Sequence, residues 1–228
     1  GYGHLGWEKL RKLLGWQQEK SEGNPHCHEC AIVKSGQTSL SKESYKRSER
    51  PIHRIHMGVI FGKDSQWEAQ VMVDDYTRRS WLVEINSKED TLITFRDLKN
   101  RIEADKATYK VAVVRTDSGT EFSSDEWEKF RKEQGIEHEF SMPYRQGGNG
   151  VCERRIQTIG HAARAMLLYA NSPADDIGDA FRHANCCTNN FPTRANQGHR
   201  SPNEVVWGSV GDVVKAGPRT VRVSRVLS

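Results

Sequence analysis

The alternation of apolar and polar positions divides the middle of the chain into strand-like and helix-like segments. Three consecutive runs are rich in β-branched and aromatic residues and predict strands: 52–61, 67–76 and 79–85. The polar stretch between the second and third runs supplies a turn, so we expect an antiparallel meander. A fourth run, 109–115, is almost continuously apolar, which is typical of a central, buried strand.

Two helices are expected in the segments that follow the meander and the fourth strand. In residues 88–105, four apolar side chains fall on one helical face: Leu92, Phe95, Leu98 and Ile102. In residues 123–135, Ser123 and Glu126 have the spacing of a capping box, and Gly135 is expected to end the helix.

The second half of the chain continues with a short strand, a loop and further helices. A fifth strand over 136–140 precedes the glycine-rich loop 141–150, and a long helix is expected from Val151. The apolar stripe of that helix has helical spacing: Cys152, Ile156, Ile159, Ala163 and Met166. Another helix is expected over about 175–190 and a capped turn over 201–208. This order predicts an α/β fold, with a mixed five-stranded sheet flanked by helices.

Composition adds few constraints. The 228 residues allow one domain plus an appendage. The excess of 34 Lys and Arg over 30 Asp and Glu is small, so the net charge of +4 is weak evidence for a nucleic-acid partner. No apolar run is long enough to predict a membrane span. The chain has no signal-peptide pattern and does not begin with Met, so we expect a piece of a longer, non-secreted chain.

Two carboxylates stand at positions that favour a common cleft. Asp117 directly follows the fourth strand, and Glu153 lies in the first turn of the long helix, with 35 residues between them. Carboxylates brought together repel each other unless a cation lies between them, and hard oxygen ligands suit Mg²⁺ or Mn²⁺. The arrangement would serve two-metal displacement at phosphorus. The plainer alternative makes Asp117 a turn residue and Glu153 a partner of the helix dipole.

Three segments around these residues resemble the integrases of copia-type retrotransposons: VVRTDSGTEFSS, PYRQGGNGVCERRIQTI and FPTRANQGHRSPNEVVWG. The resemblance covers about residues 1 to 208. It implies a ribonuclease H-like fold and DNA strand transfer, with Asp117 and Glu153 as ligands of Mg²⁺ or Mn²⁺. It also implies double-stranded DNA as partner, self-association into a homo-oligomer and an intracellular location, nuclear and cytoplasmic. The candidate contacts to DNA are Arg145, Asn149, Arg154 and Arg155.

The sequence departs from the family pattern at the first strand. The family has a third catalytic Asp there, and "RIHMGVIFG" places Gly58 at that position. We therefore expect impaired catalysis. The nearby acids Asp64, Asp74 and Asp75 are poor substitutes by position. Element decay, deliberate inactivation and adaptation to a non-catalytic role all remain open. The loop before Glu153 also departs, because Gln146-Gly147-Gly148 stands where the family carries more amides.

The first 33 residues resemble the zinc module that precedes such integrases. Cys27 and Cys30 have the spacing of a zinc knuckle, and His4 is a further candidate ligand of Zn²⁺. The family's first His would lie before this chain begins, so the module is expected to be truncated, and His26 or His28 is an alternative ligand. Reduced structural thiols are the other interpretation.

The expected organisation and function follow from these features. The predicted domains are a truncated zinc-binding module (1–33), a basic linker (34–50), a ribonuclease H-like integrase catalytic domain (51–208) and a basic tail (209–228). The predicted function is that of a retrotransposon integrase with impaired strand transfer. The first alternative is a non-catalytic nucleic-acid-binding protein derived from a retroelement. A different ribonuclease H-like nuclease is a further alternative, against which the "NGV-x-ER" segment argues.

Overall fold

The computed structural model describes residues 46–61, 67–105, 108–117, 122–140 and 149–208. Several predicted sites lie outside the described residues. The zinc module and the C-terminal tail are among them. So are five single candidates: His4, Cys27, Cys30, Asp64 and Arg145.

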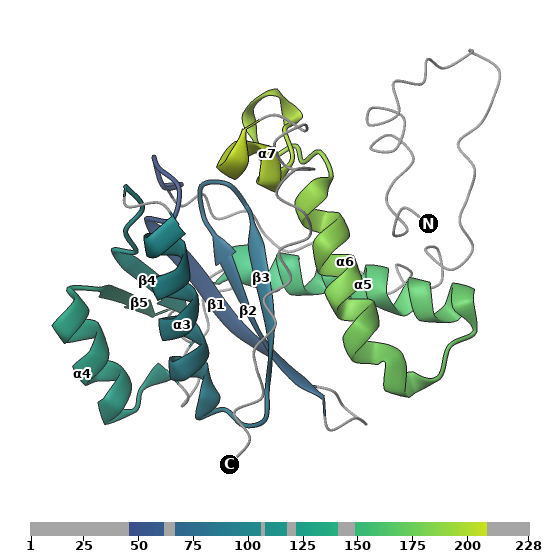
Figure 1. Ribbon diagram of the computed structural model, residues 1–228, viewed down its shortest axis with the longest axis horizontal. Coiled ribbons are helices and arrows are strands. Elements are labelled where there is room, and N and C mark those ends of the chain that lie inside the picture. The colour runs from purple at the N-terminus through teal and green to yellow at the C-terminus, as the bar shows by residue number, and fades with distance from the viewer. Residues whose placement is uncertain (1–45, 62–66, 106–107, 118–121, 141–148, 209–228) are drawn as a thin grey trace.

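A mixed five-stranded sheet forms the centre of the described structure (Figure 1). Its strands are β1 (Arg54–Phe61), β2 (Glu68–Asp74), β3 (Ser80–Ile85), β4 (Val113–Thr116) and β5 (Glu137–Phe140). They lie in the order β3-β2-β1-β4-β5. The pairs β1–β2 and β2–β3 are antiparallel, whereas β1–β4 and β4–β5 are parallel. The predicted meander and the predicted interior position of the fourth strand are confirmed.

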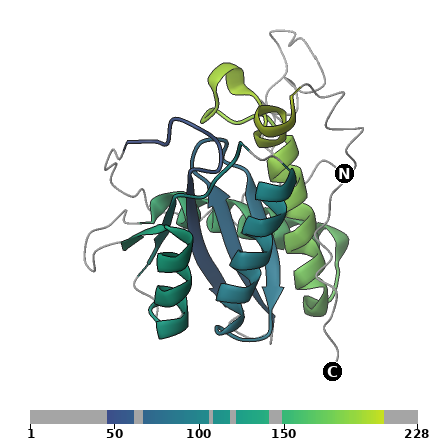
Figure 2. The same ribbon diagram turned by 60° about the vertical axis from the view of Figure 1, so that its left-hand side comes forward.

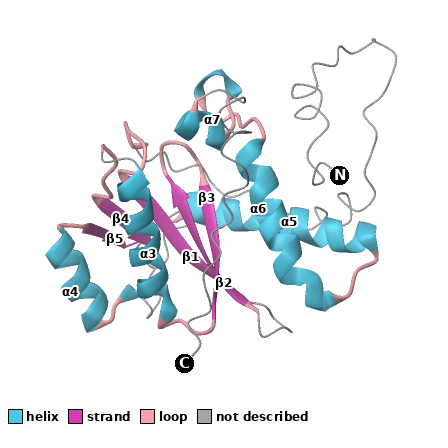
Figure 3. Cartoon of the chain, in the orientation of Figure 1, coloured by secondary structure: helices cyan, strands magenta, loops and turns pink. Residues whose placement is uncertain are grey.

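Helices cover both faces of this sheet (Figures 1 and 2). The helices are α3 (Asp90–Asp105), α4 (Asp125–Gln134), α5 (Gly150–Ala170), α6 (Ile177–Asn190) and α7 (Pro202–Trp207), with short 3₁₀ turns at Ala174–Asp176 and Gln197–His199. Figure 3 shows α3 in front of the sheet and α5 passing behind it. Helix α6 packs on α5 and β3, and α7 packs on α6.

The two faces of β1 enter two different apolar clusters because successive side chains of a strand point in opposite directions. Ile55 and Met57 pack in the cluster that α3 and α4 cover, together with Phe95 and Trp127. On the other face, Val71 of the neighbouring strand packs with Cys152 of α5. His56 and Gly58 alternate with Ile55 and Met57, so β1 presents them to the α5 side.

The predicted stripe and caps can be compared with the structure at single residues. The stripe on α5 is buried or half-buried along its whole length, as predicted. Gly135 ends α4 in the left-handed conformation, with φ of 64°. The N-cap of α4 is Ser124 rather than Ser123, however, because the Ser124 hydroxyl accepts the hydrogen bond from Trp127 N. The predicted capping box of Ser123 and Glu126 was therefore wrong by one residue.

The fourth strand is shorter than predicted, beginning at Val113 instead of residue 109. The Val111 N–H donates to the Glu103 carboxylate of α3 at 3.1 Å. The Ala112 N–H donates to His53 O before the regular ladder begins. A side chain and an irregular bond therefore satisfy the backbone where the apolar pattern predicted strand. None of the helices in the described ranges is both long and apolar enough to span a membrane.

Candidate active site

The parallel register of β1 and β4 brings Gly58 level with Asp117. His56 of β1 is paired with Arg115 of β4. Two residues further along each chain lie Gly58 and Asp117, and Asp117 directly follows the end of β4. Asp117 is exposed and Gly58 is buried. The structure therefore places the predicted first-strand position beside the strand end that carries the candidate Asp.

Helix α5 brings Glu153 to the same place through its neighbour Cys152. Cys152 is 1% exposed, and its thiol donates to Val71 O at 3.6 Å. A Cβ atom built on Gly58 would lie 3.1 Å from Cys152 Sγ. Burial, followed by the negative charges of Asp117 and Glu153, raises the pKa of the Cys152 thiol. The buried sulfur atom thus lies over Gly58 and within the electrostatic influence of both carboxylates, and Glu153 is exposed at the edge of the stripe.

These residues only partly fit a divalent metal. Asp117 and Glu153 supply hard oxygen ligands of the kind that Mg²⁺ prefers. Gly58 supplies none, and Cys152 is a neutral thiol inside the protein. Within the described parts of the chain, no group of three or more His, Cys, Asp or Glu side chains is placed to hold a metal ion. Among the residues that the structure describes, the candidate donors are thus two carboxylates, whereas two-metal chemistry requires ligands on both sides of the reacting phosphate.

The acid pair at the end of β2 is engaged in buried hydrogen bonds. Asp74 is fully buried and accepts hydrogen bonds from Ile52 N and from the Thr77 N–H and hydroxyl. Burial raises the Asp74 pKa against these hydrogen bonds. Asp75 is also buried and accepts from Ser48 N at 2.7 Å and from Arg78 at 3.0 Å. Both acids hold the β2–β3 turn and the entry to β1.

Asn149 lies inside the fold, although the resemblance makes it a candidate contact to DNA. The residue is only 3% exposed. The amide donates to Met57 O at 2.7 Å, and its oxygen lies 3.1 Å from His56 Nδ1. Asn149 O in turn accepts from Glu153 N at 3.1 Å. Asn149 therefore ties the start of α5, and with it Glu153, to β1.

The two described arginines beside Glu153 differ in exposure. Arg154 is exposed. Arg155 is half-buried, and its guanidinium donates to Arg78 O. Burial and the neighbouring Arg78 charge lower the pKa of Arg155 to about 10. A DNA contact by either residue stays a prediction, and Arg154 is the better placed of the two.

A polar chain behind Asp117 was missed in the sequence. Trp127 Nε1 donates to His138 Nδ1 at 3.2 Å, so His138 Nδ1 accepts and the ring carries its proton on Nε2. His138 Nε2 lies 2.9 Å from Thr116 Oγ1, whose hydroxyl donates to Asp117 O at 2.8 Å. Burial, followed by the Arg131 charge, lowers the pKa of His138 to about 4. The alternation in "EHEF" is the sequence signal that would have placed His138 toward the core side of β5.

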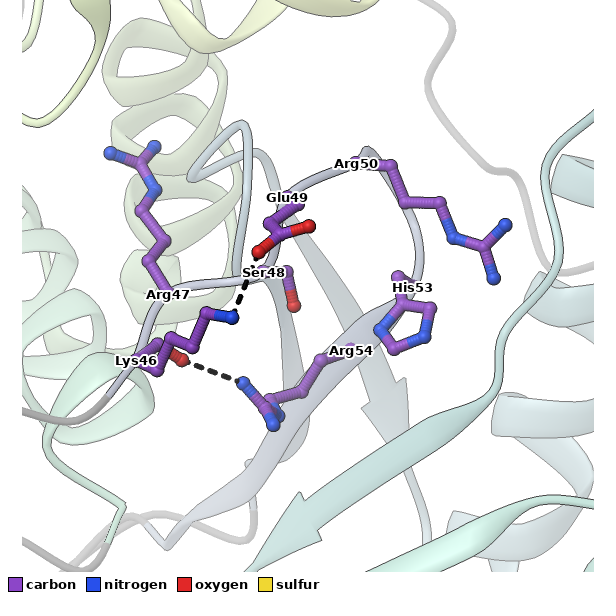
Figure 4. Close-up of a pocket in the computed structure, with 7 residues that line it drawn as sticks. All are labelled: Lys46, Arg47, Ser48, Glu49, Arg50, His53 and Arg54. Carbon is purple, nitrogen blue, oxygen red and sulfur yellow. Dashed lines mark hydrogen bonds and ion pairs between the residues drawn. The ribbon is translucent and has the colours of Figure 1, made fainter.

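A basic hollow lies at the other end of β1. It has a volume of about 350 Å³ and is lined by Lys46, Arg47, Ser48, Glu49, Arg50, His53 and Arg54 (Figure 4). Arg54 is held by Lys46 O and by the Glu139 carboxylate, and Lys46 pairs with Glu49 at 2.9 Å. Arg47 points away from the hollow and donates to Asp75 O. Residues at the end of the predicted linker 34–50 thus lie against the domain.

Comparison with known proteins gives a consistent family. Residues 48–146 match the model of the integrase core domain. The chain is 29% identical over 187 residues to the retrovirus-related Pol polyprotein from transposon RE1 of Arabidopsis thaliana, covering 80% of this chain and 12% of that protein. It is 31% identical over 121 residues to the one from transposon TNT 1-94 of Nicotiana tabacum, covering 53% of this chain and 9% of that protein. The chain thus spans about a tenth of the length of these relatives.

Solved structures agree on the fold. A chain of the simian T-cell lymphotropic virus intasome, solved in complex with the PP2A regulatory subunit B56 gamma, aligns with a TM-score of 0.57 and 16% identity, covering 89% of this chain and 66% of that one. The HTLV-2 integrase catalytic core domain, solved with magnesium in a trimeric form, aligns with a TM-score of 0.50 and 19% identity, covering 70% of this chain and 99% of that one.

A mixed five-stranded sheet with helices on both faces, like that of the HTLV-2 integrase catalytic core domain, is a ribonuclease H-like fold. The match of residues 48–146 to the integrase core domain and the similarity to the retrotransposon Pol polyproteins together support a copia-type integrase catalytic domain.

Proposed function

We propose that this domain binds double-stranded DNA but carries out strand transfer poorly or not at all. One observation carries the proposal: the β1 position level with Asp117, and beside the start of α5, is Gly58. Asp117 and Glu153 then remain as two carboxylates without the third. If the missing ligand forfeits about 4 kcal/mol of transition-state stabilisation, the rate falls about 10³-fold.

The remaining parts of the site support a role on DNA. Arg154 is exposed beside Glu153, and the hollow at Lys46, Arg50 and His53 is rich in cations. Side chains of this kind bind phosphates without reading sequence, and they make affinity depend on salt. Self-association belongs to the same proposal, because the HTLV-2 integrase catalytic core domain was solved in a trimeric form. So does action at nuclear DNA after a cytoplasmic stage, and Zn²⁺ binding by His4, Cys27 and Cys30.

A second candidate function is a domain that serves DNA binding alone. The basic hollow favours this candidate, because the hollow lies away from the two carboxylates, at the start of β1 and four residues before the level of Asp117. The two candidates differ in metal dependence. An integrase that holds a residual metal should bind DNA ends more tightly with Mn²⁺, whereas a pure binding domain should be indifferent to divalent cations.

The test is a titration of a fluorescent duplex by the full chain, in Mn²⁺ and in EDTA, with a strand-transfer assay on the same samples. We expect saturable binding in both conditions and no joined product. Efficient joining in Mn²⁺ would refute the impairment, and failure to bind duplex DNA at low salt would refute both candidate functions. Tighter binding in Mn²⁺ without joining would favour the disabled integrase over the pure binding domain.

A further inference from the structure

A side chain at position 58 would meet the thiol of Cys152. The Cβ atom of any such side chain would lie 3.1 Å from Cys152 Sγ and 3.4 Å from Ile156 Cδ1. Real Cβ atoms rarely approach a neighbour as closely as the first of these distances, because interiors are packed at van der Waals contact. Ile156 Cδ1 is the far end of a flexible side chain, so the sulfur is the contact that must move.

We propose that Cys152 occupies the space that a first-strand carboxylate needs, so that residue 152, together with residue 58, decides whether this site accepts a third acid. The inference rests on the proposed function for its catalytic meaning. The steric part of the inference does not depend on the proposed function, because it concerns only how Gly58, Cys152 and the strand beneath them pack.

The sulfur has little freedom to move away. Cys152 is 1% exposed, and its thiol donates to Val71 O at 3.6 Å. Val71 is the residue paired with Gly58 across the β1–β2 ladder. Val71 and Val73 also pack against Cys152 in one apolar cluster. The thiol is thus held over the same pair of strands from which a residue at position 58 would rise.

Helix α5 fixes the other side of the contact. Asn149 lies three residues before Cys152, and its side-chain amide donates a hydrogen bond of 2.7 Å to the carbonyl oxygen of Met57, the neighbour of Gly58. The helix start therefore cannot lift from β1 at this point without breaking a buried hydrogen bond. A larger residue at position 58 must displace either the Cys152 side chain or this link.

Gly58 and Cys152 are therefore sterically coupled, and Gly58→Asp alone is not sufficient to place a third carboxylate in the site. Gly58→Asp adds a carboxylate into a space that Sγ fills, whereas Cys152→Ala removes Sγ and leaves a good helix former in α5. Only the double variant is expected to bring a third carboxylate beside Asp117 and Glu153 without overpacking.

The first experiment is a double-mutant cycle on thermal unfolding that uses Gly58→Ala, which adds a Cβ and no charge. With Cys152 present, we expect Gly58→Ala to lower the Tm by about 5 °C, as overpacking does. In the Cys152→Ala background the same change should leave the Tm unchanged or raise it. Gly150→Ala is the matched control, because nothing lies within 4 Å of a Cβ at that position, and its effect should be equal in both backgrounds. Equal effects of Gly58→Ala in the two backgrounds would overturn the inference.

The second experiment compares Gly58→Asp with Gly58→Asp/Cys152→Ala, by the rise in Tm on adding Mn²⁺ and by strand transfer. The inference predicts a larger Mn²⁺-dependent rise for the double variant, and at least tenfold more joined product. If Gly58→Asp alone performs as well, the inference is overturned while the proposed function stands. If the cycle shows coupling and neither variant responds to Mn²⁺, the packing inference stands, and Gly58 is not the cause of impairment, which contradicts the proposed function.

Discussion

The side-chain amide of Asn149 donates a hydrogen bond of 2.7 Å to the main-chain carbonyl of Met57 and so joins the start of α5 to the middle of β1. Because Glu153 N bonds to Asn149 O, the same residue sets where the helix presents Glu153. The bond is buried, and it lies one residue from Gly58. The position of one candidate catalytic carboxylate therefore depends on the strand that carries Gly58.

Removing this link should destabilise the domain. Asn149→Ala leaves Met57 O and His56 Nδ1 without their partner, and an unsatisfied buried polar group costs about 1–3 kcal/mol. Urea unfolding followed by tryptophan fluorescence measures the loss. Gln157→Ala, at an exposed position of the same helix, should change the free energy of unfolding by less than about 0.5 kcal/mol. Equal losses in the two variants would show that the Asn149 bond contributes nothing specific.

His138 should make stability fall in mild acid. Its pKa is about 4 in the folded protein, against the ordinary histidine value of 6.5, so the folded state binds fewer protons between these values. The stabilising contribution of neutral His138 is complete above pH 6.5 and is lost as the pH falls toward 4. Because the ring is only half-buried, we expect a loss on the order of 1–2 kcal/mol, below the limit set by the full shift.

The measurement compares urea unfolding at pH 7.5 and pH 4.5 for the chain and for His138→Gln. Glu128, whose charge opposes that of Arg131 at the ring, has its pKa lowered by the hydrogen bond from Arg131 and therefore stays charged over this range. The difference between the two proteins isolates His138. We expect the variant to lose less stability on acidification, and an identical loss in both proteins would contradict the assignment.

Glu103 joins α3 to the chain that enters β4. Its carboxylate accepts from Lys99 at 3.1 Å, from Lys110 at 3.0 Å and from Val111 N at 3.1 Å. Burial alone would raise the Glu103 pKa, but hydrogen bonds from Lys110, Val111 and Lys99 outweigh it and lower that pKa. Glu103→Gln leaves the buried Lys99 charge without its anion and should cost about 2–3 kcal/mol in denaturant unfolding. Lys110→Gln, which removes an exposed partner, should cost under about 1 kcal/mol. A smaller loss for Glu103→Gln than for Lys110→Gln would be the opposite result.

Arg154 and Arg50 should contribute to DNA affinity through phosphate contacts. Each replacement by Gln should weaken duplex binding irrespective of sequence and reduce the slope of log K against log salt by about 1. Lys132→Gln on α4 is the control, because its ammonium already pairs with Glu128 at 3.5 Å. Anisotropy titrations at several salt concentrations give the slopes. Unchanged slopes for both arginine variants would remove these residues from the DNA surface.

The sequence predicted the elements whose cause is local and missed features that depend on tertiary contacts. The strands of the meander and the stripe on α5 follow from the hydrophobic period. The end of α4 follows from Gly135, because glycine readily adopts the left-handed conformation that closes a helix. The polar Asn149 follows two loop glycines, and the sequence gave no indication that it is buried, because its partners Met57 and His56 are about 90 residues away in the chain. Cys152 was predicted as core, but its contact with position 58 required the packed structure.

The most direct test compares strand transfer by this chain, in Mn²⁺, with that of its own Asp117→Asn variant. Under the proposed function the site lacks a third ligand even before Asp117 is changed, so we expect the same background level of joined product from both proteins, with duplex binding intact. If the unchanged chain joins DNA at least tenfold better than Asp117→Asn, the site is competent with Gly58 in place, and the central claim is wrong.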